Sequence, residues 1–277
     1  MRRDTVPVVS RIFGEAPDDQ STDERTPPSC DVLLLVAIDA ELEALRVVCA
    51  ELGIPLESKQ WGPLGEYFDL GVVGSDRVLA AQTRMGAIRH EGAAYKAILF
   101  RRATQATSFI QTGMAFGVDP HAQRHGDVLV ARAIFPYDDR TIRGANGQPV
   151  VDYSRTKRRA AKTALVQLFE REIERGGHAF GIHLGTMLSG SARIFCGRFR
   201  DELVSTIPVG RDRIVGGDME GLGLLSVSPA DKPLWAVVKG ISDFADEDRD
   251  GIIEATRPIA CENAVRFVLK SLRNNLL

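Results

Sequence analysis

The stretch from Gly216 to Asp246 constrains the fold of this 277-residue chain more than any other. It contains an apolar, helix-like run at 222–227 and a continuous apolar run, LWAVV, at 234–238. A strand that is apolar throughout, rather than in alternation, is typical of a parallel sheet covered on both faces. Such sheets bind ligands beyond the carboxyl ends of their strands. Asp243, which follows this strand, is therefore a candidate acid, and Glu220 is its candidate partner in one cleft.

The same order of strand, acidic turn and helix opens the ordered part of the chain. DVLLLVAI at 31–38 predicts a buried strand, and the helical spacing of Leu42, Leu45 and later apolar residues predicts a helix directly after it. Asp39 and Glu41 then fall at a helix N-terminus. Two interpretations stay open: the carboxylates stabilise the first helical turn, or Glu41 is a base that faces the cleft.

The rest of the chain continues to alternate strands and helices, which predicts a single α/β domain. We expect strands at 66–74 and 77–83, a helix from Gly86 to Ala103, a strand at 106–120 that turns at Gly113 and Gly117, a strand at 125–135, a helix at 152–177, a strand at 181–190, a helix at 191–207, a strand at 213–219 and a closing helix at 254–272.

Composition sets the limits of this interpretation. With 44% hydrophobic and 26% charged residues, the chain can bury one large core. We expect it to occupy residues 31–277, behind a mobile polar tail at 1–30. The formal net charge of −2 gives no field that would attract a nucleic acid polymer or a membrane. The four cysteines lack metal-ligand spacing, so we expect free thiols in a cytoplasmic protein.

Three weaker motifs each leave an alternative open. Gly86, if it begins a helix, is a candidate anion cradle beside Arg84 and Arg89, although solvated arginines are the commoner explanation of the pattern. His121 and His125 have metal-ligand spacing in a loop with no third ligand, which favours a surface loop.

The third weak motif is DEDRDG at 246–251, which begins like a calcium-binding loop. Its twelfth position is Arg257, where calcium needs a bidentate glutamate. We therefore expect an acidic lid at this position and no metal site.

Five motifs in order carry a family resemblance: DAELE at 39–43, TGMAFG followed by HGDVLVA, SGSA at 189–192, DMEG at 218–221 and GISDFAD at 240–246. The chain resembles the nucleoside phosphorylase and nucleosidase superfamily, and within it the branch of methylthioadenosine/S-adenosylhomocysteine nucleosidases. The likeness extends over about residues 31–275. It implies a mostly parallel mixed sheet, partly barrel-like, flanked by helices.

The resemblance also implies a reaction, cleavage of the bond between a purine and C1′ of ribose, without a cofactor. Asp243 matches the residue that protonates N7 of the base. Glu220 matches the carboxylate that holds the ribose hydroxyls, Met219 lines the sugar, and Glu41 matches the glutamate that activates water. The family resemblance further implies a homodimer or larger homo-oligomer, with a purine nucleoside or nucleotide as its small-molecule partner.

Further substrate contacts are expected around these groups. The candidates are Ile38, Gly113, Met114, Arg193, Ile194, Phe195 and Ser242. A phosphate on the 5′ position would instead meet arginines, for which Arg84, Arg89, Arg193 and Arg249 are the candidates.

Departures from the family pattern bear on the reaction and on base binding. Gln111 and Met114 stand where phosphorylases of the superfamily hold phosphate with an arginine and a serine, and Glu41 would repel that anion. Arg193 replaces the aromatic residue that stacks on the purine, so stacking must come from its guanidinium, from Phe195 or from elsewhere.

The sequence thus predicts a nucleosidase that hydrolyses the N-glycosidic bond of an adenine nucleoside or nucleotide. One alternative is a phosphate-dependent purine nucleoside phosphorylase. Another is a non-catalytic nucleoside sensor on the same fold, which Arg193 and Met114 in the expected pocket would suit.

Overall fold

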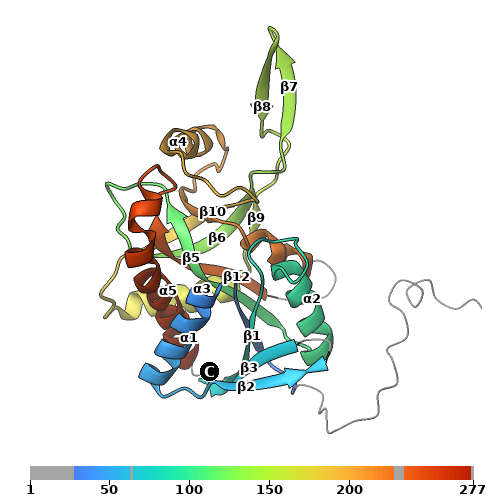
Figure 1. Cartoon of the computed structure of the whole chain (residues 1–277), viewed down its shortest axis with the longest axis vertical. Coiled ribbons are helices and arrows are strands. Elements are labelled where there is room, and N and C mark those ends of the chain that lie inside the picture. The colour runs from blue at the N-terminus through green and yellow to red at the C-terminus, as the bar shows by residue number, and fades with distance from the viewer. Residues whose placement is uncertain (1–27, 63–64, 228–233, 276–277) are drawn as a thin grey trace, which may run out of the picture.

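The computed structural model describes residues 28–62, 65–227 and 234–275. Residues 1–27 of the mobile tail predicted at 1–30 lie outside the described residues. Within them the chain forms one α/β unit built on a mixed sheet (Figure 1). The predicted fold class is confirmed.

The main sheet follows the apolar runs of the sequence. Its strands are β1 (Val32–Val36), β2 (Glu57–Trp61), β3 (Gly65–Val73), β4 (Asp76–Gln82), β5 (Ser108–Gly117), β6 (Val128–Pro136), β9 (Arg159–Ala160), β10 (Ile182–Ser189), β11 (Ile214–Asp218) and β12 (Leu234–Asp243).

Strand β5 lies at the centre of the sheet, and three other strands pair with it. It runs parallel to β1 and to β12, and its end pairs with β11 in the antiparallel sense. Strand β11 also pairs with β10, which pairs with β6 and so returns to β12. This circuit partly closes the sheet into a barrel, whereas β4, β3 and β2 extend it as an open edge beyond β1.

Helices cover both faces of the sheet. They are α1 (Asp39–Leu52), α2 (Ala93–Thr104), α3 (Thr163–Arg175), α4 (Gly197–Thr206), the 3₁₀ helix η3 (Gly221–Val227) and α5 (Arg249–Arg273). One core cluster joins α1, α3 and α5 to one face, and a second joins α2 and η3 to the other (Figure 1). Leu34 and Leu35, adjacent on β1, enter opposite clusters because successive strand residues point to opposite faces.

Three predicted boundaries are wrong. Helix α2 begins at Ala93 rather than Gly86, because Gly86 and Glu91 have φ of +104° and +60°, which no right-handed helix contains. Strand β5 runs through Gly113 without the expected turn and ends at Gly117. The helix expected from residue 191 begins at Gly197, which leaves 190–196 as a loop beside the sheet end.

The fourth difference lies between β6 and α3. The predicted helix at 152–177 begins only at Thr163, and its basic N-terminal part holds the short strand β9. Before it, β7 (Thr141–Ala145) and β8 (Gln148–Asp152) form a separate two-stranded hairpin that projects from the body (Figure 1).

Among the described residues, none of the helices is both long and apolar enough to cross a bilayer.

Candidate active site

A cavity opens at the carboxyl ends of β1, β4, β5, β10, β11 and β12, the edge at which an α/β sheet binds its ligands. Most of the predicted site residues line it. They are Ile38, Glu41, Met114, Arg193, Ile194, Met219, Glu220, Ser242, Asp243 and Arg249. Others found there, which sequence reasoning missed as site residues, include Met85, Phe116 and Asp218.

Glu41 reaches the cavity from the first turn of α1 and is only 2% exposed. Its Oε1 accepts a hydrogen bond of 2.8 Å from the backbone N–H of Met114, and its Oε2 accepts one from the N–H of Ala37. Gly113 makes room for it, because a Cβ there would lie 1.9 Å from Oε1. Gly113 therefore supports the site through the backbone and does not line the cavity. Asp39, by contrast, is exposed and accepts from Gln82.

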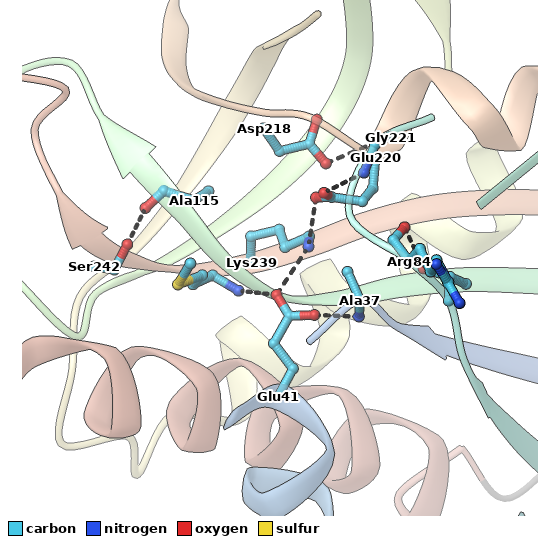
Figure 2. A network of polar contacts seen from close by, with 12 residues as sticks. Ala37, Glu41, Arg84, Ala115, Asp218, Glu220, Gly221, Lys239 and Ser242 are labelled. Atoms are coloured by element: carbon cyan, nitrogen blue, oxygen red, sulfur yellow. Dashed lines mark hydrogen bonds and ion pairs between the residues drawn. The ribbon is translucent and has the colours of Figure 1, made fainter. Parts of the chain in front are cut away.

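Lys239 is the principal residue that sequence reasoning missed. It is fully buried on β12, and its Nζ lies 3.3 Å from Oε1 of Glu41 and 3.3 Å from Oε2 of Glu220 (Figure 2). One ammonium group thus ties together two carboxylates that arrive from different strand ends. The available signal is a single charge inside the apolar run VVKGI, because a lysine is almost never fully buried without a partner.

Glu220 is fixed on its other side by the loop before α2. Its Oε1 accepts a hydrogen bond of 3.1 Å from the N–H of Gly86. The glycine that the sequence suggested as an anion cradle therefore donates to a carboxylate of the chain itself. Asp218, two residues earlier, accepts from the N–H of Gly221 at 2.8 Å, while its Oδ1 is buried without a hydrogen-bond partner (Figure 2).

Burial and mutual charge shift the ionisation of this cluster. Desolvation raises the pKa of Glu41 above its usual value, Lys239 opposes the shift, and Glu220 adds to it. Desolvation likewise raises the pKa of Asp218 to about 6. For Lys239, burial disfavours the charge, but Glu41, Glu220 and Asp218 outweigh it and raise its pKa. The lysine therefore stays charged.

Asp243 ends β12, lines the cavity and is 4% exposed. Its Oδ1 accepts from the N–H of Ala245 at 3.0 Å, and Nε of Arg249 lies 3.3 Å from Oδ2. The hydroxyl of Ser242 lies 2.8 Å from Oδ2 and 3.2 Å from the carbonyl oxygen of Ala115. A hydroxyl has one proton to donate. It can donate to an ionised Asp243, or accept from a protonated Asp243 and donate to Ala115.

The predicted arginine contacts divide into two groups. Arg249 and Arg193 line the cavity. The guanidinium of Arg249 lies 4.8 Å from the ring centroid of Phe195, and Phe195, a predicted substrate contact, does not line the cavity. Arg84 and Arg89 are exposed and do not line this cavity, and Arg84 is paired with Glu91 at 2.8 Å. The structure therefore does not bring these two to the site.

The two motifs with partial metal-ligand spacing, at 121–125 and 246–251, make contacts of other kinds. His125 packs against the ring of Phe244 at 5.0 Å between centroids, and Asp246 lies 3.8 Å from Arg200. Across the residues that the structure describes, no three His, Cys, Asp or Glu side chains are gathered closely enough to hold a metal ion. The stretch expected to form an acidic lid leads into the first turn of α5.

Comparisons with known proteins show the family of this chain. The sequence model of the phosphorylase superfamily matches residues 31–273. A 5′-methylthioadenosine/S-adenosylhomocysteine nucleosidase of Mycobacterium bovis is 25% identical over 238 residues, which cover 78% of this chain and 86% of the relative.

Two solved structures share the fold. A 5′-methylthioadenosine/S-adenosylhomocysteine nucleosidase from Neisseria meningitidis, in complex with methylthio-immucillin-A, matches with a TM-score of 0.70 at 19% identity, over 87% of this chain and 98% of its own. The futalosine hydrolase of Helicobacter pylori matches with a TM-score of 0.68 at 17% identity, over 87% and 96%.

Proposed function

This chain belongs to the phosphorylase superfamily, and on that premise we propose that it is a purine nucleosidase. It uses water to cleave the N-glycosidic bond of an adenine nucleoside or nucleotide, and it releases the free base and a ribosyl product. The M. bovis relative and the two structural neighbours carry the names of nucleosidases or a hydrolase, which supports this choice of reaction.

The observation that carries the proposal is the position of the Glu41 carboxylate. It accepts hydrogen bonds from the backbone N–H groups of Ala37 and Met114, which would otherwise be free to bind an anion. A phosphate nucleophile would have to displace a buried negative charge, whereas water needs a base there. The site therefore favours hydrolysis over phosphorolysis.

At the sugar, the carboxylates perform two tasks. Glu41 takes a proton from water as the water oxygen attacks C1′. Burial raises the pKa of Glu41, which makes this carboxylate a stronger base. Glu220 accepts hydrogen bonds from the ribose hydroxyls. Both lie where positive charge develops on the oxocarbenium-like sugar, and so both stabilise the transition state. Lys239 holds them in position.

At the base, Asp243 acts as the general acid. The electrons of the C1′–N bond move into the purine as the bond breaks, and Asp243 delivers its proton to N7. Ser242 supports both states of this acid, because it can accept from the protonated form and donate to the ionised form. A positioned acid of this kind supplies about 10²- to 10⁴-fold in rate.

The proposal is tested by incubating the protein with adenosine, methylthioadenosine, S-adenosylhomocysteine, AMP and ATP, with and without phosphate, and measuring free adenine by chromatography. We expect release without phosphate from at least one compound, and its loss in Glu41→Gln. If no compound releases adenine, or if release requires phosphate, the hydrolase assignment is wrong; the second result would identify a phosphorylase.

One observation favours a different class, a nucleoside sensor. Arg193 lines the cavity, although the family resemblance implies a purine-stacking aromatic residue at that position, and Met114 lines it too. A sensor would show a rise in melting temperature with a nucleoside that the protein leaves intact. The same compounds in a thermal-shift assay, followed by chromatography, distinguish the two.

Two further properties complete the proposal. We expect a homodimer or larger homo-oligomer, as the family resemblance implies, and light scattering coupled to size exclusion measures it. All four cysteines are unpaired, which supports a reducing compartment such as the cytoplasm.

A further inference from the structure

We propose that Phe116 is the aromatic residue on which the purine ring of the substrate stacks. The inference rests on the proposed function, since it assumes that the substrate contains a purine. It assigns a base-binding residue at the position where the sequence left stacking unassigned.

The sheet register sets Phe116 beside the proposed acid. In the pairing of β5 with β12, the residue opposite Phe116 is Asp243, and in the pairing of β5 with β11 it is Gly217. A base that receives a proton from Asp243 must lie within hydrogen-bond reach of that carboxyl group. Phe116 lines the same cavity and is only half-buried, so part of its surface is available to a ligand.

The ring extends sideways over β11, and two features fix its position there. A Cβ on Gly217 would lie 2.3 Å from Cζ and 2.8 Å from Cε1 of Phe116, so any other residue at 217 would force the ring to move. On another side, Phe116 packs against the core cluster that includes Leu188, Ile194 and Ala245. A ring fixed on one side and open to a cavity on the other is a preorganised stacking surface.

The other aromatic side chains near the site are already engaged. Phe195 lies under the guanidinium of Arg249, Phe244 is 7% exposed and packs against His125, and Tyr137 is buried with its hydroxyl donating to the carbonyl of Ala192. Among the described residues that line the cavity, Phe116 is the only aromatic one.

The chemistry also suits a neutral aromatic ring. Every purine presents a π face, so stacking binds the base with little dependence on its substituents. The leaving base takes the bonding electrons while N7 gains a proton, so it departs as a neutral ring, and that ring can stack on an aromatic face throughout the reaction. Phe116 should therefore contribute to base binding and continue to contribute as the proton is transferred.

The test measures binding of the free bases adenine, hypoxanthine and guanine by calorimetry, which does not require hydrolysis. Phe116→Leu should weaken the binding of each base that the wild-type protein binds by about 5- to 100-fold, and by a similar factor for each, as expected for the loss of stacking. Phe199→Leu is the matched control, because Phe199 packs partly buried against the same core cluster but does not line the cavity; its affinities should equal those of the wild type.

A second perturbation displaces the ring without removing it. Gly217→Ala should weaken the same bases, because its methyl group takes the space of the ring edge. The double variant Phe116→Leu/Gly217→Ala should lose less affinity than the sum of the two single losses, since leucine lacks the ring atoms that the methyl group meets and only the carbonyl oxygen of Leu188, 2.9 Å away, remains. Additive losses would show that Gly217 acts on the base by another route and would contradict the inference.

Unchanged affinities in Phe116→Leu overturn the inference, as does a wild-type protein that binds none of the three bases. Circular dichroism and thermal melting identify any variant that fails to fold, and Gly217→Ala then decides. A protein that binds adenine but never releases it from a nucleoside would contradict the proposed function alone, and the effect of Phe116→Leu on adenine affinity would still decide the stacking role.

Discussion

Replacing Lys239 with methionine removes a cation that lies between two buried carboxylates. Methionine has a similar length and no charge, so the change leaves Glu41 and Glu220 facing each other without compensation. Breaking a buried ion pair by removing one partner costs about 3–5 kcal/mol of unfolding free energy. Because Lys239 is fully buried and serves two partners, we expect a loss in that range at neutral pH or above.

The loss should depend on pH. Lys239 lowers the pKa of Glu41, which burial has already raised, so the substitution raises it further. An acid whose pKa is higher in the folded than in the unfolded state contributes stability that is fully present below the unfolded value. That contribution is lost as pH rises through the folded pKa. The defect should therefore be large at pH 8 and smaller at pH 5.

Urea denaturation of the wild type, Lys239→Met and Lys59→Met at both pH values tests this reasoning. Lys59 also pairs with a glutamate, Glu57 at 2.9 Å, but on the surface, so its loss should leave the urea midpoint unchanged. Lys239→Met should be inactive as well, because Glu41 and Glu220 lose their positions. An equal midpoint in the two variants, or a defect independent of pH, would refute the electrostatic account.

Three other changes have defined outcomes. Asp243→Asn should lower kcat by about 10²- to 10⁴-fold in a variant that circular dichroism shows to be folded, and undiminished turnover would exclude its role as the acid. Gly113→Ala should abolish adenine release because its methyl group meets the Glu41 carboxylate, whereas Gly147→Ala, also at positive φ but with open space around it, should keep full activity; equal activities would contradict this. Burial raises the pKa of Asp218 to about 6, so the stability that its protonated form gives the protein is lost as pH rises through that value. Asp218→Asn should therefore flatten the fall of melting temperature between pH 4 and 7, and parallel curves of melting temperature against pH for variant and wild type would show that Asp218 does not titrate there.

The sequence reveals the acidic residues of the site because each follows an apolar strand that is recognisable on its own. Glu41 comes after β1, Glu220 after β11, and Asp243 at the end of β12. It does not reveal Lys239, because the meaning of a charge inside an apolar strand depends on partners 198 and 19 residues away. The sequence does not reveal the position of the Phe116 ring for a related reason, because that position depends on Gly217 in strand β11.

The misplaced elements have local causes. The segment before α2 has helix-compatible residues, but the N–H of Gly86 donates to Glu220, and this tertiary contact outweighs helix propensity. The β7–β8 hairpin has a clear signal in Asn146-Gly147, whose positive φ values of 50° and 74° suit a tight turn. Its flanking residues carry no strong apolar alternation, and Pro149 argues against a strand.

The central position of β5 has a consequence for how the protein is made. Strand β5 binds β1 from the beginning of the fold and β12 from near its end, and the ion pair between Glu41 and Lys239 spans 198 residues of sequence. Such contacts form late, because the loop between them must close first. During synthesis, then, the chain should remain inactive until β12 has left the ribosome and inserted beside β5, and adenine release would report the completion of the whole sheet.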